Sequence, residues 1–413
     1  MSAEPVEYLL IGGGVASASC AERLREEGAD GRIVLVGREA DPPYHRPPLS
    51  KGYLSGSSGR EDALLHAAGW WEEHGIELLA RTSVMKLDPA VRVVKLSNRE
   101  ELRFEKALLA TGANVRRLRA EGGDLDGIHY LRAFGNADAI RADVESAEEV
   151  VVIGGSYLGA EVAASLTAPG RRCTVLMQED VMLDRHFGAV VGGFFQGILE
   201  EHGVRVRGGD QLERFEGPAE GRVTAVITAG GERLPCQCVV VAAGVMPDVM
   251  LARSAGLVVG ESGGVSCSSR LESSVPGVYA AGDVAEWDSP LHGRSARIEH
   301  WDVAREQGRV AALNMLGRDL AYEVMPYFWS DLSEWVSLEY VGVDSPGSGG
   351  GVVRGSMGDG EFTAFYRDGE GRVTGVLTVG RSHELEPARR LIRERGAPDA
   401  AALADVSTDL AAL

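Results

Sequence analysis

The segment that decides the fold class of this chain is Tyr8-Leu9-Leu10-Ile11-Gly12-Gly13-Gly14-Val15-Ala16-Ser17. An apolar run typical of a strand leads into a glycine turn, and a stretch rich in Ala, Glu and Leu, typical of a helix, follows. Glycines at such a turn let the backbone approach a pyrophosphate, whose charge lies at the helix N-terminus. Strand, glycine turn and helix in this order therefore predict a Rossmann-like domain that binds a dinucleotide.

A second segment repeats the pattern in Val150-Val151-Val152-Ile153-Gly154-Gly155-Ser156-Tyr157-Leu158-Gly159. Apolar strands ended by small residues also occur twice, at Leu108–Ala113 and Val239–Val245, which supports an internal duplication. One glycine turn indicates one dinucleotide. Two turns indicate a flavin dinucleotide and a nicotinamide dinucleotide in one α/β protein with two Rossmann-like domains, and therefore electron transfer between the two cofactors.

Bulk composition limits the class of protein. The chain has 413 residues, 44% of them hydrophobic and 25% charged, which suits a globular protein of two or three domains. A net charge of -19 argues against nucleic acid and anionic membranes as partners. The acidic N-terminus has no basic region or cleavage site, and the five cysteines are scattered, so we expect an unprocessed cytoplasmic protein. Either a monomer or a homodimer is expected.

The C-terminal part shows strand patterns of another kind. Alternation at Glu361–Tyr366 and Arg372–Val379, separated by turn residues, predicts an antiparallel sheet. Ser345–Gly351 is expected to be a flexible Gly/Ser loop, and residues 397–413 either a short docking helix or a frayed end. Arg389, Arg390, Arg393 and Arg395 would form one basic helix face, which is either solvated surface or a docking face for a protein partner.

With these residues in view, the chain resembles the FAD-dependent pyridine nucleotide oxidoreductases, and among them the ferredoxin reductases that serve bacterial oxygenases. It is also similar to apoptosis-inducing factor and monodehydroascorbate reductase. The most specific segments are Pro-Pro-Leu-Ser-Lys at 47–51, Ala-Thr-Gly at 110–112, Val-Tyr-Ala-Ala-Gly-Asp at 278–283, Arg-Ile-Glu-His-Trp at 297–301 and Pro-Tyr-Phe-Trp-Ser-Asp at 326–331.

The resemblance implies a glutathione reductase-like architecture. It gives an FAD domain in two parts, 1–117 and 245–325, and an NAD domain at 118–244. A C-terminal α+β domain with an antiparallel sheet, at 326–413, would help to cover the flavin. The implied partner is a [2Fe-2S] ferredoxin.

The resemblance also implies roles for individual residues. Lys51 would place a cation near the flavin, and Glu161 would point toward the nicotinamide and pair with Lys51; the alternatives are a surface lysine and a helix-surface glutamate. Asp283 would accept hydrogen bonds from the ribityl hydroxyls or cap a helix. Glu299 and Trp329 would border the isoalloxazine, although Trp329 is alternatively an ordinary core aromatic.

Other residues complete the expected cofactor sites. Glu39 follows the predicted strand at 31–37 and would accept hydrogen bonds from an adenosine ribose. Glu179 would repel a 2′-phosphate and favour NADH over NADPH, although Arg171, Arg172 and Arg185 argue the other way. The remaining residues expected to bind cofactors are Gly12, Gly14, Val15, Ala16, Arg46, Val84, Ala110, Thr111, Gly112, Arg132, Gly154, Ser156, Tyr157, Leu158, Gly159, Gly244, Gly282, His300 and Trp301.

The cysteines exclude one large branch of the superfamily. Disulfide reductases use a cysteine pair beside the flavin and peroxidases a single early cysteine, but no cysteine lies between Cys20 and Cys173. Cys236 and Cys238 occupy a predicted strand and share one of its faces. We therefore expect no metal site. The resemblance implies an NADH-dependent FAD enzyme that passes electrons singly to a ferredoxin. The alternatives are a reductase of a small organic radical or quinone and an NADH-sensing flavoprotein.

Overall fold

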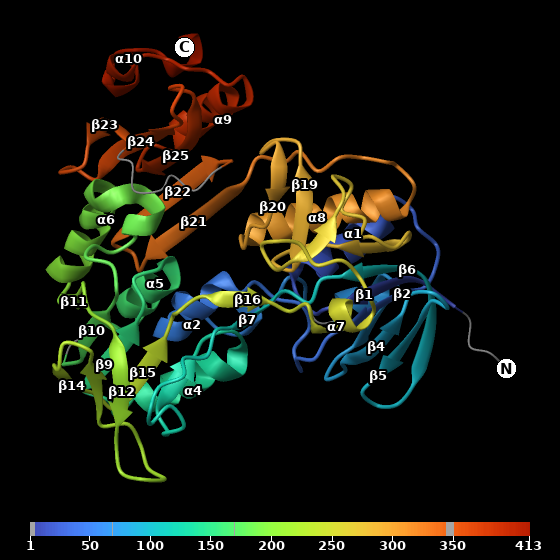
Figure 1. Ribbon diagram of the computed structural model, residues 1–413, viewed down its shortest axis with the longest axis horizontal. Coiled ribbons are helices and arrows are strands. Elements are labelled where there is room, and N and C mark those ends of the chain that lie inside the picture. The colour runs from blue at the N-terminus through green and yellow to red at the C-terminus, as the bar shows by residue number, and fades with distance from the viewer. Residues whose placement is uncertain (1–4, 68, 169, 344–350) are drawn as a thin grey trace. The chain divides into compact units, whose positions relative to one another are not determined.

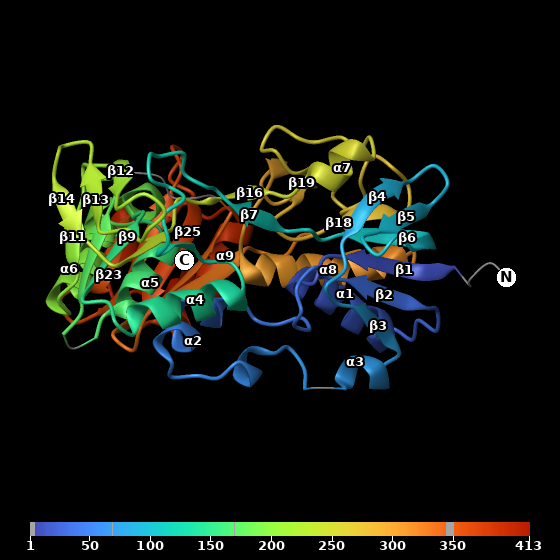
Figure 2. The same ribbon diagram turned by 90° about the horizontal axis from the view of Figure 1, so that it is seen from below.

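The computed structural model describes residues 5–67, 69–168, 170–343 and 351–413 (Figures 1 and 2). Two compact units divide the chain. The first unit contains Met1–His45, Arg60–Asn114 and Val245–Pro326, and the second contains Arg46–Gly59, Val115–Gly244 and Tyr327–Leu413. The Gly/Ser loop expected at Ser345–Gly351 lies outside the described residues except for Gly351.

The first unit is built on a mixed sheet in the order β3-β2-β1-β6-β5-β4, and β18 also pairs with β6. β1, β2, β3 and β18 run parallel to their neighbours, whereas β4, β5 and the first part of β6 form an antiparallel meander. The strands are β1 (Val6–Ile11), β2 (Ile33–Val36), β3 (Ile76–Leu79), β4 (Val84–Asp88), β5 (Val93–Leu96), β6 (Glu101–Leu109) and β18 (Val278–Ala280).

Two helices of the first unit, α1 (Val15–Glu26) and α8 (Trp301–Met315), pack closely together (Figures 1 and 2). A Cβ added to Gly308 on α8 would come within 2.1 Å of the Ala16 carbonyl oxygen on α1. Only a glycine allows this approach. The contact joins the chain segment after residue 245 to the segment before residue 46, so both build one Rossmann-like fold.

The second unit contains a parallel sheet in the order β11-β10-β9-β15-β8. Its strands are β8 (Ile128–Tyr130), β9 (Glu149–Ile153), β10 (Arg172–Leu176), β11 (Arg205–Arg207) and β15 (Cys238–Val241), and its helices are α4 (Phe134–Val144), α5 (Tyr157–Leu166) and α6 (Asp184–Glu201). Apolar runs predicted two of these strands, β9 and β15, and both are almost wholly buried. The expectation of a second Rossmann-like fold is confirmed.

The second unit also contains an antiparallel sheet in the order β21-β22-β25-β24-β23, shown in orange to red in Figure 1. It is formed by β21 (Tyr327–Leu332), β22 (Val336–Gly342), β23 (Val352–Ser356), β24 (Glu361–Arg367) and β25 (Val373–Val379), and α9 (Leu385–Arg393) packs on β25 and β22. The antiparallel sheet expected from the alternating pattern is therefore present.

The remaining elements are short. They are α2 (Gly52–Ser55), α3 (Trp70–Glu73), α7 (Met250–Ser254), α10 (Ala400–Ala404), β7 (Ala113–Val115), β12 (Leu212–Glu216), β13 (Ala225–Thr228), β14 (Arg233–Pro235), β16 (Val245–Pro247), β17 (Val265–Cys267), β19 (Ala285–Ser289), β20 (Arg294–Ala296) and the 3₁₀ turns Pro47–Ser50, Glu61–Ala63, Ser382–Glu384 and Leu410–Ala412.

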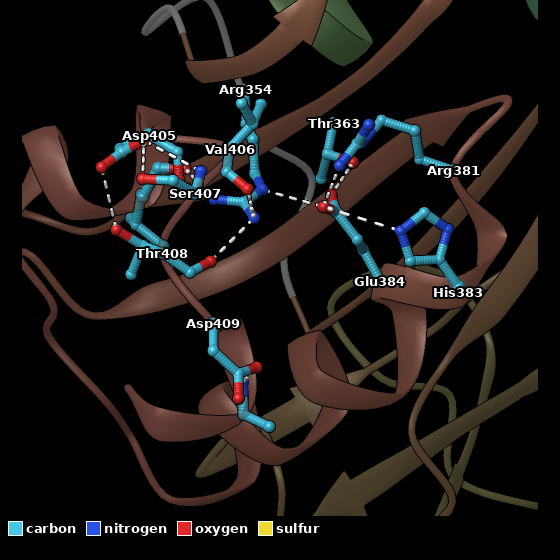
Figure 3. A network of polar contacts seen from close by, with 12 residues as sticks. Arg354, Thr363, Arg381, His383, Glu384, Asp405, Val406, Ser407, Thr408 and Asp409 are labelled. Atoms are coloured by element: carbon cyan, nitrogen blue, oxygen red, sulfur yellow. Dashed lines mark hydrogen bonds and ion pairs between the residues drawn. The ribbon is translucent and has the colours of Figure 1, made fainter.

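The C-terminal segment is held by one buried arginine (Figure 3). Arg354 on β23 is 4% exposed, and its Nε donates to Glu384 Oε1 at 2.8 Å. Its two terminal nitrogens donate to four backbone carbonyls of the C-terminal segment, those of Leu403, Asp405, Val406 and Thr408. All the donors of this side chain have acceptors, so the C-terminal segment docks on the sheet and is not frayed.

Glu384, 3% exposed, is the carboxylate of this network. Burial by itself would raise the pKa of Glu384, but hydrogen bonds from Arg381, Thr363 and Arg354 outweigh it and lower the pKa to about 2. Because the folded-state pKa is below the ordinary value of 4.5, this stability is present above pH 4.5 and is lost as the pH falls toward 2.

We expect Arg354→Met to destabilise the C-terminal domain by about 3 kcal/mol, because it leaves a buried carboxylate with fewer partners. Arg372→Met is the matched control, since Arg372 pairs with Asp368 at the surface, where ion pairs contribute about 0–1 kcal/mol. Urea unfolding and limited proteolysis of residues 395–413 measure the effects. Equal destabilisation by the two variants would contradict this role of Arg354.

Candidate functional site

The first glycine turn has the geometry of an anion cradle. Gly12 has a φ of +126°, and a Cβ there would lie 2.1 Å from the Ala110 carbonyl oxygen. A Cβ on Gly14 would meet no atom within 4 Å, so the space above the turn is open. Gly14 is the N-cap of α1, whose first turn carries no acidic residue. The backbone N–H groups in the first turn of α1, which starts with Val15 and Ala16, can therefore bind a pyrophosphate.

Two buried polar atoms of the first unit fit a bound polar cofactor. Ser17 Oγ on α1 and Gln307 Nε2 on α8 have no hydrogen-bond partner within the described ranges. The other amide atom of Gln307, Oε1, accepts a 2.8 Å hydrogen bond from the N–H of Gly282. Since buried polar groups normally have partners, a ligand rich in hydrogen-bonding groups suits this region. Ser17, three residues after Gly14, is fully buried.

The carboxylates expected to bind FAD lie at the carboxyl ends of parallel strands. Glu39 follows β2, and its Oε2 accepts a 2.6 Å hydrogen bond from the Tyr44 hydroxyl, a contact that the sequence did not predict. Asp283 follows β18 and comes directly after Gly282, whose φ is +79°. Ligands of open α/β sheets bind at this edge.

Three small residues, Ala110, Thr111 and Gly112, follow the end of β6 at the same edge. Thr111 Oγ1 donates to the Asp248 carbonyl oxygen at 2.7 Å, and Gly112 accepts a 2.9 Å hydrogen bond from the Asp248 N–H. These bonds fix the small residues beside the glycine turn. Val84, another predicted contact, is the first residue of β4.

The Arg-Ile-Glu-His-Trp segment joins Glu299 to the backbone around Asp283. Arg297 Nη1 contacts Glu299 Oε1 at 2.5 Å and donates to the Asp283 carbonyl oxygen at 3.3 Å. His300 is the N-cap of α8, and the Trp301 ring lies 5.2 Å from the His45 ring. Arg297 was not among the predicted site residues, although it stood inside a recognised segment.

The second glycine turn repeats the geometry of the first. Gly154 has a φ of +123°, and a Cβ there would lie 2.4 Å from the Ala242 carbonyl oxygen. A Cβ on Gly159 would lie 2.0 Å from the Gly154 oxygen. Ser156, which follows Gly155, caps α5: its Oγ accepts from the Gly159 N–H at 3.5 Å. Tyr157 and Leu158 form the first turn of α5, and Gly244, with a φ of +87°, follows β15.

Glu179 follows β10 at the carboxyl edge of the second parallel sheet and pairs with Arg185 at 2.6 Å. Arg172 instead pairs with Glu149, and both residues begin their strands, at the opposite edge of the sheet. Arg171 donates to the carbonyls of Leu166 and Val144. Arg171 and Arg172 are therefore not placed to attract a 2′-phosphate, and the expectation that they would do so is wrong. Of the three arginines, only Arg185 contacts Glu179 at the nucleotide edge.

The ion pair expected between Lys51 and Glu161 is present, with 2.6 Å between Lys51 Nζ and Glu161 Oε1. Both side chains are largely buried, which excludes a surface lysine and a helix-surface glutamate. Two hydroxyls also donate to Glu161, Ser50 to Oε2 and Ser330 to Oε1, each at 2.6 Å. Sequence reasoning missed these two serines, although both lie in segments that carried the resemblance.

Three further predicted residues, Arg46, Arg132 and Trp329, also belong to the second unit. Arg46 Nη1 donates to the Arg132 carbonyl oxygen at 2.6 Å, which brings two predicted cofactor-binding residues together within the second unit. Trp329 precedes Ser330 on β21, is half-buried, and its ring lies 6.2 Å from the ring of Tyr327. Its contact with a flavin stays a prediction.

All five cysteines are free and buried. Burial raises the pKa of Cys173, Cys236, Cys238 and Cys267 to about 12, and that of Cys20 further. Since the thiolate is the reactive form, none of these thiols suits disulfide exchange. In the part of the chain that the structure describes, no three His, Cys, Asp or Glu side chains form a cluster suited to a metal, and no helix has the length and apolar character needed to cross a bilayer.

Comparisons with known proteins agree with this geometry. Residues 6–308 match the model of the pyridine nucleotide-disulphide oxidoreductases, and residues 327–413 match that of the reductase C-terminal domain. The ferredoxin--NAD(+) reductase component of the anthranilate 1,2-dioxygenase system of Burkholderia cepacia is 36% identical over 413 residues, covering 99% of each chain.

Two solved structures are also similar. The ferredoxin reductase for the CYP199A2 system of Rhodopseudomonas palustris superimposes with a TM-score of 0.93 at 29% identity, covering 98% of this chain and 99% of the other. The reductase in a covalent putidaredoxin reductase–putidaredoxin complex gives 0.91 at 34% identity, covering 99% and 98%. By its sequence, its two glycine cradles and its C-terminal sheet, the chain belongs to the pyridine nucleotide-disulphide oxidoreductase family and is an oxidoreductase of the ferredoxin reductase type.

Proposed function

We propose that this protein is an NADH-dependent FAD enzyme that reduces a [2Fe-2S] ferredoxin serving an oxygenase. The observation that carries the proposal is a pair of nucleotide cradles in a chain whose thiols are all buried. Bound FAD would supply the chemistry of accepting a hydride from the nicotinamide and releasing electrons one at a time. Without a reactive cysteine to relay them, the electrons go to an external acceptor, and the relative in the putidaredoxin complex supports a ferredoxin.

The chain's own residues would bind and orient the cofactors. The N-terminus of α1 binds the pyrophosphate of FAD, Glu39 the adenosine ribose and Asp283 the ribityl chain. The N-terminus of α5 binds the pyrophosphate of NADH. Lys51, held by Glu161, supplies a positive charge that stabilises negative charge developing on the cofactor during reduction.

We expect the purified protein to contain noncovalent FAD and Asp283→Ala to bind it roughly 10- to 150-fold more weakly, since a hydrogen bond to a charged group contributes about 1.5–3 kcal/mol. Asp288→Ala is the control, because Asp288 is exposed on β19 in the same unit. Flavin fluorescence after dilution measures the dissociation constant. A colourless protein that cannot be reconstituted with FAD would refute the assignment.

We expect kcat/KM to be at least about tenfold higher for NADH than for NADPH, a ratio that corresponds to about 1.4 kcal/mol. Glu179 repels a 2′-phosphate, and its ion pair with Arg185 occupies a cation that could otherwise attract that group. Glu179→Gln should narrow the ratio, whereas Glu213→Gln, on an exposed position of β12, should leave it unchanged. Equal values for the two nucleotides in the unmodified protein would overturn the preference.

The basic cluster at the end of α9 differs from the expected helix face. The helix ends at Arg393, and Arg395 lies beyond it with a φ of +54°. Arg389 lies over the Tyr327 ring at 5.4 Å, and Arg390 donates to the Leu410 carbonyl oxygen at 3.0 Å. These two arginines therefore have contacts within the domain, and the exposed cations left for an acidic partner are Arg393 and Arg395.

If the ferredoxin docks on these cations, Arg393→Glu with Arg395→Glu should lower the association rate constant about tenfold or more at low salt. Reduction of ferricyanide, which needs no docking face, should stay unchanged. Lys86→Glu with Lys95→Glu makes the same charge change on exposed positions of β4 and β5 and serves as the control. Stopped-flow reduction of the ferredoxin measures the rates, and equal rates in both double variants would assign the cluster to solvated surface.

A further inference from the structure

The hydrogen bonds of Glu161 join three segments of the second unit. Ser50 and Lys51 belong to the Pro-Pro-Leu-Ser-Lys segment at 47–51, Glu161 belongs to α5, and Ser330 belongs to β21 of the antiparallel sheet. Each carboxylate oxygen accepts a serine hydroxyl, and Oε1 also contacts the Lys51 ammonium. The carboxylate is therefore fixed from both sides.

The two serines are not equivalent. The Ser50 hydroxyl has one proton and two acceptors in reach, Glu161 Oε2 at 2.6 Å and the Pro47 carbonyl oxygen at 3.2 Å. Ser330 Oγ, on a residue that is 4% exposed, donates to Glu161 Oε1, the same oxygen that Lys51 contacts. Ser330 therefore acts directly on the contact between the carboxylate and the ammonium.

We propose that Ser330 is a positioning residue of the reductase, which holds Glu161 in the conformer that keeps the Lys51 ammonium in place. This inference rests on the proposed function, since it assigns a role in the reduction by NADH. It extends that function by making the reduction step depend on the antiparallel sheet. Through the hydroxyl of Ser330, β21 also donates a hydrogen bond to Glu161, in addition to its packing within the sheet.

The physical reason is the freedom of a glutamate side chain. A carboxylate bound at both oxygens by three donors has one orientation, whereas loss of the Ser330 hydroxyl leaves Oε1 with the flexible Lys51 side chain alone. The terminal torsion angle of a glutamate side chain has a broad distribution of values. Without the Ser330 hydroxyl, the contact between Glu161 and Lys51 would therefore be made only part of the time. The residues expected to bind the nucleotide, such as Ser156 and Glu179, would be unaffected.

The test is stopped-flow reduction of the FAD-loaded enzyme by NADH, with no ferredoxin present. We expect Ser330→Ala to lower the limiting rate constant about tenfold, the change that corresponds to a loss of about 1.4 kcal/mol, while the dissociation constant of NAD⁺ stays within about twofold. Ser337→Ala is the matched control, since Ser337 lies exposed on β22 and donates to Asp331. Ser330→Thr, which keeps the hydroxyl, should restore most of the rate.

A double-mutant cycle separates positioning from general destabilisation. If Ser330 acts through Glu161, Ser330→Ala should have little further effect in a Glu161→Gln background. A crystal structure of Ser330→Ala gives a readout that does not depend on turnover, and it should show Glu161 in more than one conformer. Additive effects, or a single unchanged conformer of Glu161, would overturn the proposal.

The outcomes also distinguish this proposal from the function on which it rests. If the unmodified protein binds FAD but is not reduced by NADH, the proposed function fails. If the unmodified protein is reduced and Ser330→Ala matches it in rate, the proposed function stands and the role of Ser330 is refuted.

Discussion

The structure depends on a close approach of backbone to backbone at two glycines. Gly12 and Gly154 both have a positive φ, and both lie against the carbonyl oxygen of a residue that follows a neighbouring parallel strand, Ala110 in one unit and Ala242 in the other. Any side chain at either position would overlap that carbonyl. Because the turn is compressed in this way, the following helix begins at the strand edge with its N–H groups directed at the place where a pyrophosphate binds.

Buried charge has two different uses in the second unit. The Arg354–Glu384 pair lies in the C-terminal domain. Arg354 fixes the C-terminal segment by donating hydrogen bonds to its backbone carbonyls. The Lys51–Glu161 pair joins a loop, a helix and a sheet with the help of two hydroxyls. Desolvation offsets much of the attraction within such pairs, but loss of one partner leaves a buried charge, so each pair also specifies a geometry. The first pair fixes the C-terminal segment on the sheet, and the second fixes the Lys51 ammonium beside α5.

Local patterns made much of the fold predictable. Apolar runs predicted β1 and β9, glycines predicted both turns, and alternating polarity predicted β24 and β25. Each of these signals depends only on residues that are close in the sequence. Long-range partners were not predictable in the same way: Ser330 reaches Glu161 from a distant strand, and Arg390 binds the Leu410 carbonyl oxygen. Arg172 is an intermediate case. It begins the apolar run of β10, and this place at the start of a parallel strand was a readable signal that it lies far from the nucleotide edge.

The buried thiols show how one fold supports different routes for electrons. A member of this superfamily with a cysteine pair beside its flavin passes electrons to sulfur within the chain, so part of its specificity is written in a motif. Here all five thiols are buried, and burial raises their pKa values, so none of them suits a relay to sulfur. The proposed route instead takes the electrons to an external acceptor. A docking surface needs complementary charge and shape but no fixed spacing of residues. Two glycine turns in the sequence therefore indicate the cofactors, whereas kinetic measurements are the means to identify the electron acceptor.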